Sequence, residues 1–233
     1  IQTIPEGIKI TASDMEIAFT GEYPANVMSH GEITLSARQL FDIVKSLPQD
    51  NVHLRSLEND WMEVTSGKAY FKIVGLSSEG YPAIPGMDSA NTFRLSSAAL
   101  KDMIEHTFFS IATDDSRYGL NGAFLERVSE EEGGGLRMIS TDGHRLSLIT
   151  RTFPEPIDLG DGYLLPRKGL AELKKLCDEF KGEDIEVAFN DNSATFRHGR
   201  VVFFMRLLEG DFPDYRQVIP QRCQRKVSIN RDE

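Results

Sequence analysis

Residues 7–14 of this 233-residue chain read GIKITASD, and residues 135–142, which lie 128 positions further on, read GLRMISTD. Both stretches begin with glycine, end with aspartate and share one apolar pattern. Two further pairs of segments follow with nearly the same spacing: 67–71 (GKAYF) with 199–203 (GRVVF), and 79–82 (EGYP) with 209–213 (EGDFP). A repeat of this length indicates one fold used more than once, and repeated modules commonly build extended or ring-like surfaces.

The repeat also divides the chain. The second copy opens near Thr92, whereas Ile1 aligns near position 129, so about 37 residues of the first copy are absent. Residues 227–231 resemble 93–97, the opening of the second copy. We therefore expect a fragment of a longer protein. It should comprise a partial first module over 1–88, a complete second module over 89–222 and the start of a truncated third module over 223–233.

Composition limits the class of protein. With 40% hydrophobic and 27% charged residues, the chain is a normal globular sequence. Its formal net charge of −10 disfavours a protein that grips nucleic acid over its whole surface, because tight binders neutralise many phosphates with lysine and arginine. A locally basic face on an acidic body is compatible with that charge.

The cysteines and apolar runs bear on the compartment. Cys177 and Cys223, the only cysteines, lack CxxC spacing, so neither a disulfide framework nor a zinc site is predicted. Cys177 falls on the apolar stripe of a predicted helix, which favours a core position. No apolar run approaches the roughly 20 residues of a membrane span, and no signal-like leader opens the chain. We expect a cytoplasmic protein with no membrane partner, no metal and no cofactor.

Periodicity predicts the elements. Ser36 and Gln39 fit a helix capping box, and Pro48 ends that helix. Its apolar stripe consists of Leu40, Phe41, Ile43, Val44 and Leu47. Two more helices are predicted, over 96–109 and from Pro166 to about Phe180. Strands are predicted over 8–28, 51–56, 61–65, 69–74, 120–128, 135–141, 145–151, 184–189, 193–198 and 201–208. Repeated modules of two helices packed on antiparallel sheets form an α+β fold.

Residues 141–146 (TDGHRL) hold the densest cluster of reactive side chains. In a catalytic interpretation, Asp142 orients His144 in a hydrolase, with Ser140 nearby. No serine or cysteine lies in a nucleophile-elbow motif, which disfavours that hypothesis. In the alternative, the strand ends in a turn where Gly143 takes a backbone angle that other residues avoid. The other four histidines lack the spacing of metal ligands.

Four motifs together resemble one known family. They are RYGLNG at 117–122, STDGHRL at 140–146, LPRKG at 165–169 and GDFPDYR at 210–216. In this order and spacing they are similar to the bacterial DNA polymerase III beta subunits, the sliding clamps, over essentially the whole chain. The resemblance implies the DNA clamp (processivity-factor) fold. Full-length members are three-domain subunits that form a head-to-tail homodimer ring, with helices lining a hole around duplex DNA.

The resemblance implies a function without catalysis. A processivity factor is a cytoplasmic, nucleoid-associated protein that slides on DNA. It tethers DNA polymerase III, the clamp loader and other replication and repair proteins, which bind it through short peptides. Weak, sequence-independent attraction from a few basic helix residues suits sliding, and negative charge elsewhere keeps DNA off the outer surface. By resemblance, the DNA-facing residues are Arg38, Arg117, Tyr118, Arg167 and Lys168. Gly119 stands where relatives often carry an aromatic residue, so one contact is missing.

The resemblance also places a peptide pocket between the second and third domains. The matching positions are Leu120, Thr141, Gly143, His144, Arg145, Leu146, Pro213 and Val218. The leucines, Pro213 and Val218 would form an apolar floor, and His144 and Arg145 would supply polar contacts. The alternative for Leu120 and Leu146 is a purely structural role in the hydrophobic core. Gln217 replaces an arginine of better-known members, and the family's C-terminal tail completes the pocket. We therefore expect weaker or no peptide binding by this fragment.

Three residues match the edge strand that joins two subunits in the family: Lys68, Phe71 and Ile73. An exposed strand with alternating apolar side chains can extend a partner's sheet. The expected partner strand lies in the third domain of another subunit, so ring closure is expected to fail for this fragment. Two other functions stay open. One is the hydrolase using Asp142 and His144, and the other is a repeat-built structural protein that does not bind nucleic acid.

Overall fold

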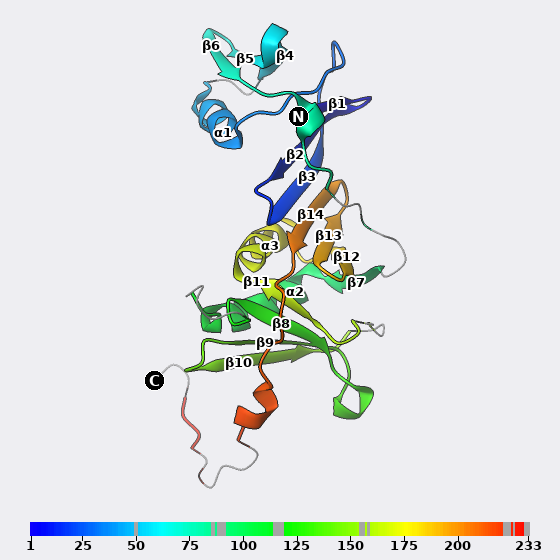
Figure 1. Ribbon diagram of the computed structural model, residues 1–233, viewed down its shortest axis with the longest axis vertical. Coiled ribbons are helices and arrows are strands. Elements are labelled where there is room, and N and C mark those ends of the chain that lie inside the picture. The colour runs from blue at the N-terminus through cyan, green and yellow to red at the C-terminus, as the bar shows by residue number, and fades with distance from the viewer. Residues whose placement is uncertain are drawn as a thin grey trace.

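The computed structural model describes residues 1–48, 51–84, 87, 92–113, 119–153, 157, 159–220, 225 and 227–230. The chain is elongated, with the strands and helix of the first module at one end and the second module beyond them (Figure 1). Residues 225 and 227–230 form neither helix nor strand. The predicted start of a third module therefore stays a prediction.

Among its described residues, the first module contains one α-helix and six strands. They are β1 (Gln2–Ile4), β2 (Gly7–Ser13), β3 (Ile17–Pro24), α1 (Ala37–Ser46), β4 (His53–Ser56), β5 (Trp61–Ser66) and β6 (Ala69–Val74). Ser36 caps α1, because its hydroxyl oxygen accepts a hydrogen bond from the backbone N–H of Gln39 at 3.4 Å. The helix ends two residues before Pro48, as the sequence predicts.

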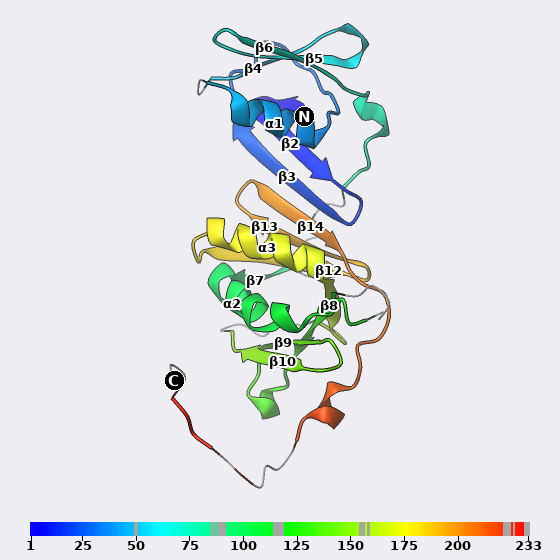
Figure 2. The same cartoon turned by 90° about the vertical axis from the view of Figure 1, so that its left-hand side faces the viewer.

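In the described part of the second module there are two α-helices and eight strands. They are β7 (Thr92–Ser96), α2 (Ser97–Thr107), β8 (Gly122–Arg127), β9 (Leu136–Thr141), β10 (Leu146–Arg151), β11 (Tyr163–Pro166), α3 (Arg167–Glu179), β12 (Asp184–Asn190), β13 (Ser193–His198) and β14 (Val201–Arg206). The two helices lie side by side between a sheet above and a sheet below (Figure 2). The predicted α+β architecture is confirmed.

One sheet runs through both modules. Its seven strands are ordered β1-β2-β3-β14-β13-β12-β7, and β3 of the first module pairs antiparallel with β14 of the second. Phe19 lies opposite Phe203 in this pairing. The other sheets are β10-β9-β8-β11 in the second module and β4-β5-β6 in the first. Within the described residues, β6 and β10 are therefore outermost strands.

The main core lies in the second module. Leu170 and Leu173 of α3 and Met103 of α2 are fully buried in one cluster with residues of both flanking sheets. Cys177 belongs to the same cluster, as its place on the apolar stripe predicts, and burial raises the pKa of its thiol to about 12. A smaller cluster in the first module contains Ile33, Met62, Val64 and Ile73.

The turns after the two repeated stretches have the same hydrogen bonds. In each module an aspartate, Asp14 or Asp142, accepts through Oδ1 from the backbone N–H groups two and three residues further on, at 3.0–3.1 Å. The next residue has positive φ in both cases, 79° at Met15 and 87° at Gly143. This agreement shows that the two halves of the chain repeat one local structure.

The structure also corrects several predictions. Residues 8–28 form two strands, β2 and β3, because the turn at Asp14 divides them. Strands β1, β7 and β11 were not predicted. On α1, Phe41 is 63% exposed and Val44 42%, although both belong to the predicted apolar stripe. The other stripe residues, Leu40, Ile43 and Leu47, pack on the small cluster. Phe41 and Val44 stay exposed because no second helix lies beside α1 among the described residues.

Candidate functional site

The turn between β9 and β10 is built around the carboxylate of Asp142. Its Oδ1 accepts from the backbone N–H groups of His144 and Arg145, both at 3.0 Å, and its Oδ2 accepts from Arg145 Nε at 3.0 Å. The bond from His144 N–H, followed by the bonds from Arg145, lowers the pKa of Asp142 to about 2. The carboxylate therefore holds the turn in shape.

We expect Asp142 to titrate near pH 2 in a carboxyl-detected NMR experiment. Because the folded pKa lies below the ordinary value of 3.8, its stabilising contribution is present above pH 3.8 and is lost as the pH falls through about 2. Asp142→Asn should remove this part of the pH dependence of unfolding. A carboxyl group that titrates at its ordinary value would contradict the assignment.

The hydrolase hypothesis finds no support in this geometry. Asp142 binds the backbone N–H of His144, and no hydrogen bond to the His144 ring occurs in the part of the chain that the structure describes. Ser140 is fully buried, and its hydroxyl donates to the carbonyl oxygen of Thr107 at 2.6 Å. Neither residue is therefore arranged for nucleophilic catalysis with Asp142.

The predicted peptide-pocket residues lie on three segments: Leu120 in the turn before β8, the β9–β10 hairpin, and residues 211–218. Thr141 and Leu146 pair across β9 and β10, and the exposed residues Gly143, His144 and Arg145 form the turn between them. Leu120 and Leu146 are half-buried, so neither is plain core. Pro213 and Val218 are exposed on the third segment, residues 211–218, which includes the 3-10 helix Tyr215–Val218. Val218 is 68% exposed.

A polar cavity of about 330 Å³ joins part of this surface to α3. It is lined by Phe109, Ile111, Ala112, Thr113, Asp142, His144, Arg145 and Arg167. The Arg145 guanidinium lies over the Phe109 ring at 5.8 Å. Two predicted pocket residues, His144 and Arg145, thus share a cavity with one predicted DNA-facing residue, Arg167.

The predicted DNA-facing residues differ in their surroundings. Arg38 is exposed at the start of α1, whereas Arg117 and Tyr118 lie outside the described residues. Arg167 is half-buried and donates to the carbonyl oxygens of Phe108 and Ile111, each at 3.1 Å. Its guanidinium also lies 4.2 Å from the centre of the Phe108 ring. Arg167 therefore joins α3 to the end of α2 as well as contributing charge.

Lys168 is paired with the first module. Its ammonium group lies 2.8 Å from Asp14 Oδ2 and 2.7 Å from Glu16 Oε2, and the hydrogen bond to Asp14, followed by that to Glu16, raises the pKa of Lys168. These carboxylates belong to the turn between β2 and β3. The charge of Lys168 is thus largely neutralised within the chain, and the residue links the two modules.

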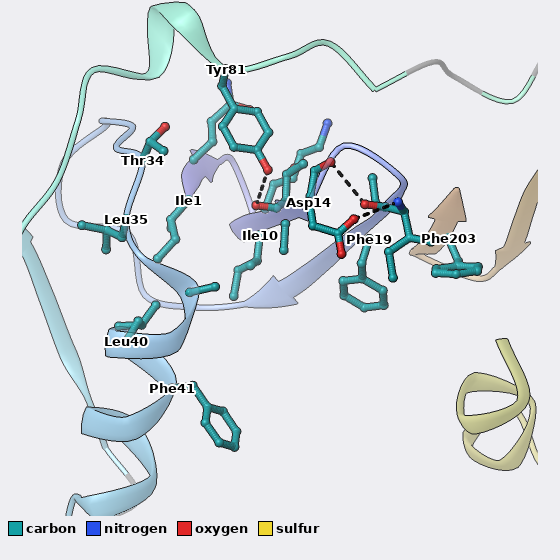
Figure 3. A pocket seen from close by; sticks show the side chains of 18 of the residues that line it. Ile1, Ile10, Asp14, Phe19, Thr34, Leu35, Leu40, Phe41, Tyr81 and Phe203 are labelled. Carbon is teal, nitrogen blue, oxygen red and sulfur yellow. Dashed lines mark hydrogen bonds between the residues drawn. The ribbon is translucent and has the colours of Figure 1, made fainter. Parts of the chain in front are cut away.

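A mostly apolar cavity lies between the modules (Figure 3). Its volume is about 1040 Å³, and its walls include Ile10, Phe19, Leu40, Phe41 and Phe203. In the second module, α2 covers the inner side of the equivalent strands β9 and β10. The exposed stripe residues of α1 face this cavity, which accounts for their exposure.

The predicted subunit-interface residues lie on or beside β6. Ile73 is 3% exposed, and Phe71 packs against the same small cluster, so both side chains support the strand from inside. The exposed side of β6 carries Tyr70 and Val74 instead, at 55% and 57%. Lys68 is exposed in the turn before the strand. The interface role of these residues stays a prediction.

The sequence did not reveal a partly buried cluster of charged side chains around Glu126. Glu126 of β8, Arg137 of β9 and the motif residues Tyr215 and Arg216 contact one another. The motif was recognised, but nothing in the sequence showed that its partner would be Glu126, 89 positions away. Among the described residues, no group of three histidine, cysteine or acidic side chains could hold a metal, and no helix is long and apolar enough to cross a membrane.

Comparison with known proteins gives one consistent family. Residues 1–85 match the DNA polymerase III beta subunit, N-terminal domain, and residues 94–214 match its central domain. The beta sliding clamp of Rickettsia bellii is 33% identical over 227 residues, which are 96% of this chain and 59% of that protein. For the beta sliding clamp of Pseudomonas aeruginosa the identity is 31%, over 97% of this chain and 60% of that protein.

Solved structures that resemble this chain belong to the same family. The sliding clamp of Bartonella birtlesii bound to griselimycin has a TM-score of 0.87 and 32% identity, covering 94% of this chain and 59% of its own. The Bacillus subtilis sliding clamp has a TM-score of 0.84 and 29% identity, covering 95% of this chain and 59% of its own. The chain thus spans about three fifths of the length of these relatives.

Proposed function

Because this chain belongs to the family of bacterial DNA polymerase III beta subunits, the sliding clamps, we propose that it forms part of a DNA polymerase processivity factor that binds partners without catalysis. Within that role, its partners are duplex DNA, which the ring encircles, and DNA polymerase III, the clamp loader and other clamp-binding proteins. It acts in the cytoplasm at the nucleoid. The observation that carries this proposal is the repeat of like modules joined edge to edge by one continuous sheet.

The junction between the modules supports ring assembly. There, β14 of the second module pairs with β3 of the first. In the repeat, β6 corresponds to β14 and β10 corresponds to β3, and both are outermost strands in the described sheets. Each end of the elongated molecule thus has an unpaired strand edge of the kind that pairs at the junction. The same pairing repeated between modules and subunits builds the head-to-tail homodimer ring of a full-length protein.

The helices supply the DNA-facing side. All three lie toward the viewer in Figure 2, so α1, α2 and α3 share one side of the chain. Arg38 is exposed there, whereas Arg167 and Lys168 are already bound to carbonyl and carboxylate oxygens. This leaves a modest free positive charge on a protein of net charge −10, which suits loose, sequence-independent contact.

We expect the outer surface formed by the β9–β10 turn and residues 211–218 to retain weak binding of griselimycin, the molecule that the Bartonella birtlesii clamp holds. Titration followed by ¹⁵N NMR detects even millimolar binding, and the shifted amides should cluster around Leu120, Leu146 and Val218. Leu146→Ala should weaken binding about tenfold, which corresponds to about 1.4 kcal/mol, because it removes an apolar contact at the centre of the surface.

Val74→Ala is the matched control for this titration. Val74, like Leu146, is an aliphatic strand residue, but it lies on β6 in the first module, so its replacement should leave the affinity unchanged. Shifts that map elsewhere on the chain, or the absence of binding at millimolar griselimycin, would contradict the proposed partner surface.

A further inference from the structure

The carboxylate of Glu126 lies in a row of polar side chains on the outer face of the four-stranded sheet. Glu126 of β8 is opposite Arg137 of β9, which is opposite Thr150 of β10. Arg137 donates through Nη1 to Glu126 Oε1 at 3.4 Å and through Nε to Thr150 Oγ1 at 3.2 Å. Glu126 is only 8% exposed, and a buried charge is tolerated when it is paired and hydrogen-bonded in this way.

Two residues of the segment 211–218 complete this cluster. The hydroxyl of Tyr215 donates to Glu126 Oε1 at 2.5 Å and accepts from Arg137 Nη1 at 3.1 Å. Arg216 Nη2 donates to both carboxylate oxygens of Glu126, each at 3.2 Å, and its guanidinium lies over the Tyr215 ring. One carboxylate therefore accepts from a sheet residue and from two consecutive residues of the segment.

A second contact fixes the other end of the segment. The rings of Phe212 and Phe124 stack at 5.4 Å between centroids, with an interplanar angle of 6°. Phe124 and Glu126 lie on the same face of β8, two residues apart. Pro213 lies between the aromatic contact and the charged contact, and Val218 follows the charged contact in the same 3-10 helix.

We propose that Glu126 is a positioning residue, which holds residues 211–218 against the sheet and thereby places Pro213 and Val218 for partner binding. This inference rests on the proposed function. Glu126 itself is covered and acts through Tyr215 and Arg216. Neutralising it removes the charge that both guanidinium groups share, and the coupled hydrogen bonds weaken together. The exposed side of the segment then loses its fixed position.

Two measurements on the complete 233-residue chain test the proposal. In Glu126→Gln, which keeps the side-chain shape, amide hydrogen exchange in 211–218 should rise at least tenfold while exchange in α3 stays unchanged. The affinity for griselimycin should fall about tenfold. Tyr215→Phe, which removes one hydroxyl and leaves the charge pairs, should give a smaller change in the same direction. Glu186→Gln is the control, because Glu186 also accepts from two arginines, Arg94 and Arg197, but on the seven-stranded sheet.

A double-mutant cycle between Glu126 and Val218 distinguishes positioning of the segment from a general loss of stability. If Glu126 acts through the segment, Val218→Ala should weaken griselimycin binding in the wild-type background but add little in the Glu126→Gln background. Unchanged exchange in 211–218, unchanged affinity despite faster exchange, or additive effects of the two substitutions would each overturn the inference. Failure of the unsubstituted chain to bind griselimycin would instead overturn the proposed partner surface, and the inference with it.

Discussion

Gly135→Ala is expected to destabilise the chain by about 3–5 kcal/mol, because it combines a backbone clash with an unfavourable backbone angle. Gly135 has φ +100°, and a Cβ atom there would lie 2.2 Å from the carbonyl oxygen of Arg151 and 2.8 Å from Thr152 Cα. Both atoms belong to backbone, so rotation of a side chain cannot relieve the overlap. The measurement is the free energy of unfolding in urea, obtained from the shift in midpoint.

Gly133→Ala is the matched control. Gly133 has nearly the same angle, φ +104°, but a Cβ atom there has open space around it. Its replacement should therefore cost only the energy of the unfavourable backbone angle, about 1 kcal/mol. The difference between the two variants isolates the clash. Equal losses of stability would show that the close approach at Gly135 is relieved by movement of the chain.

The same glycine explains why the repeat is visible in the sequence. Gly135 opens the second repeated stretch and Gly7 opens the first. A Cβ atom on Gly7 would lie 2.0 Å from the carbonyl oxygen of Tyr23, which occupies the place that Arg151 has in the second module. The sequence shows the glycine and its spacing. The contact that requires it crosses to another strand, and no local pattern reveals that contact.

The candidate site was predictable in part. The TDGHRL motif locates the turn and Gly143 signals its geometry, so the alternative of a strand ending in a turn could be weighed before the structure was known. The roles of Lys168 and Arg167 could not be read in this way. Both are basic residues at the start of a helix, and only the fold brings them against Asp14 and the Phe108 carbonyl.

The apolar stripes of two helices show how far hydrophobic periodicity predicts burial. Phe41 of α1 and Leu173 of α3 both fall on predicted apolar stripes, yet Phe41 is 63% exposed and Leu173 is fully buried. Periodicity identifies the face of a helix that is able to pack. Whether it does pack depends on a neighbour, and α3 has α2 beside it whereas α1 faces the large cavity.

Leu173→Ala is therefore expected to cost about 2–5 kcal/mol, the range for deleting a buried leucine from a close-packed core. Phe41→Ala should cost less than about 1 kcal/mol, because most of the ring is already in contact with water. Urea unfolding followed by circular dichroism gives both values. If Phe41→Ala destabilised the chain as strongly as Leu173→Ala, the Phe41 side chain would have to be buried in solution, and the cavity beside α1 would not be open.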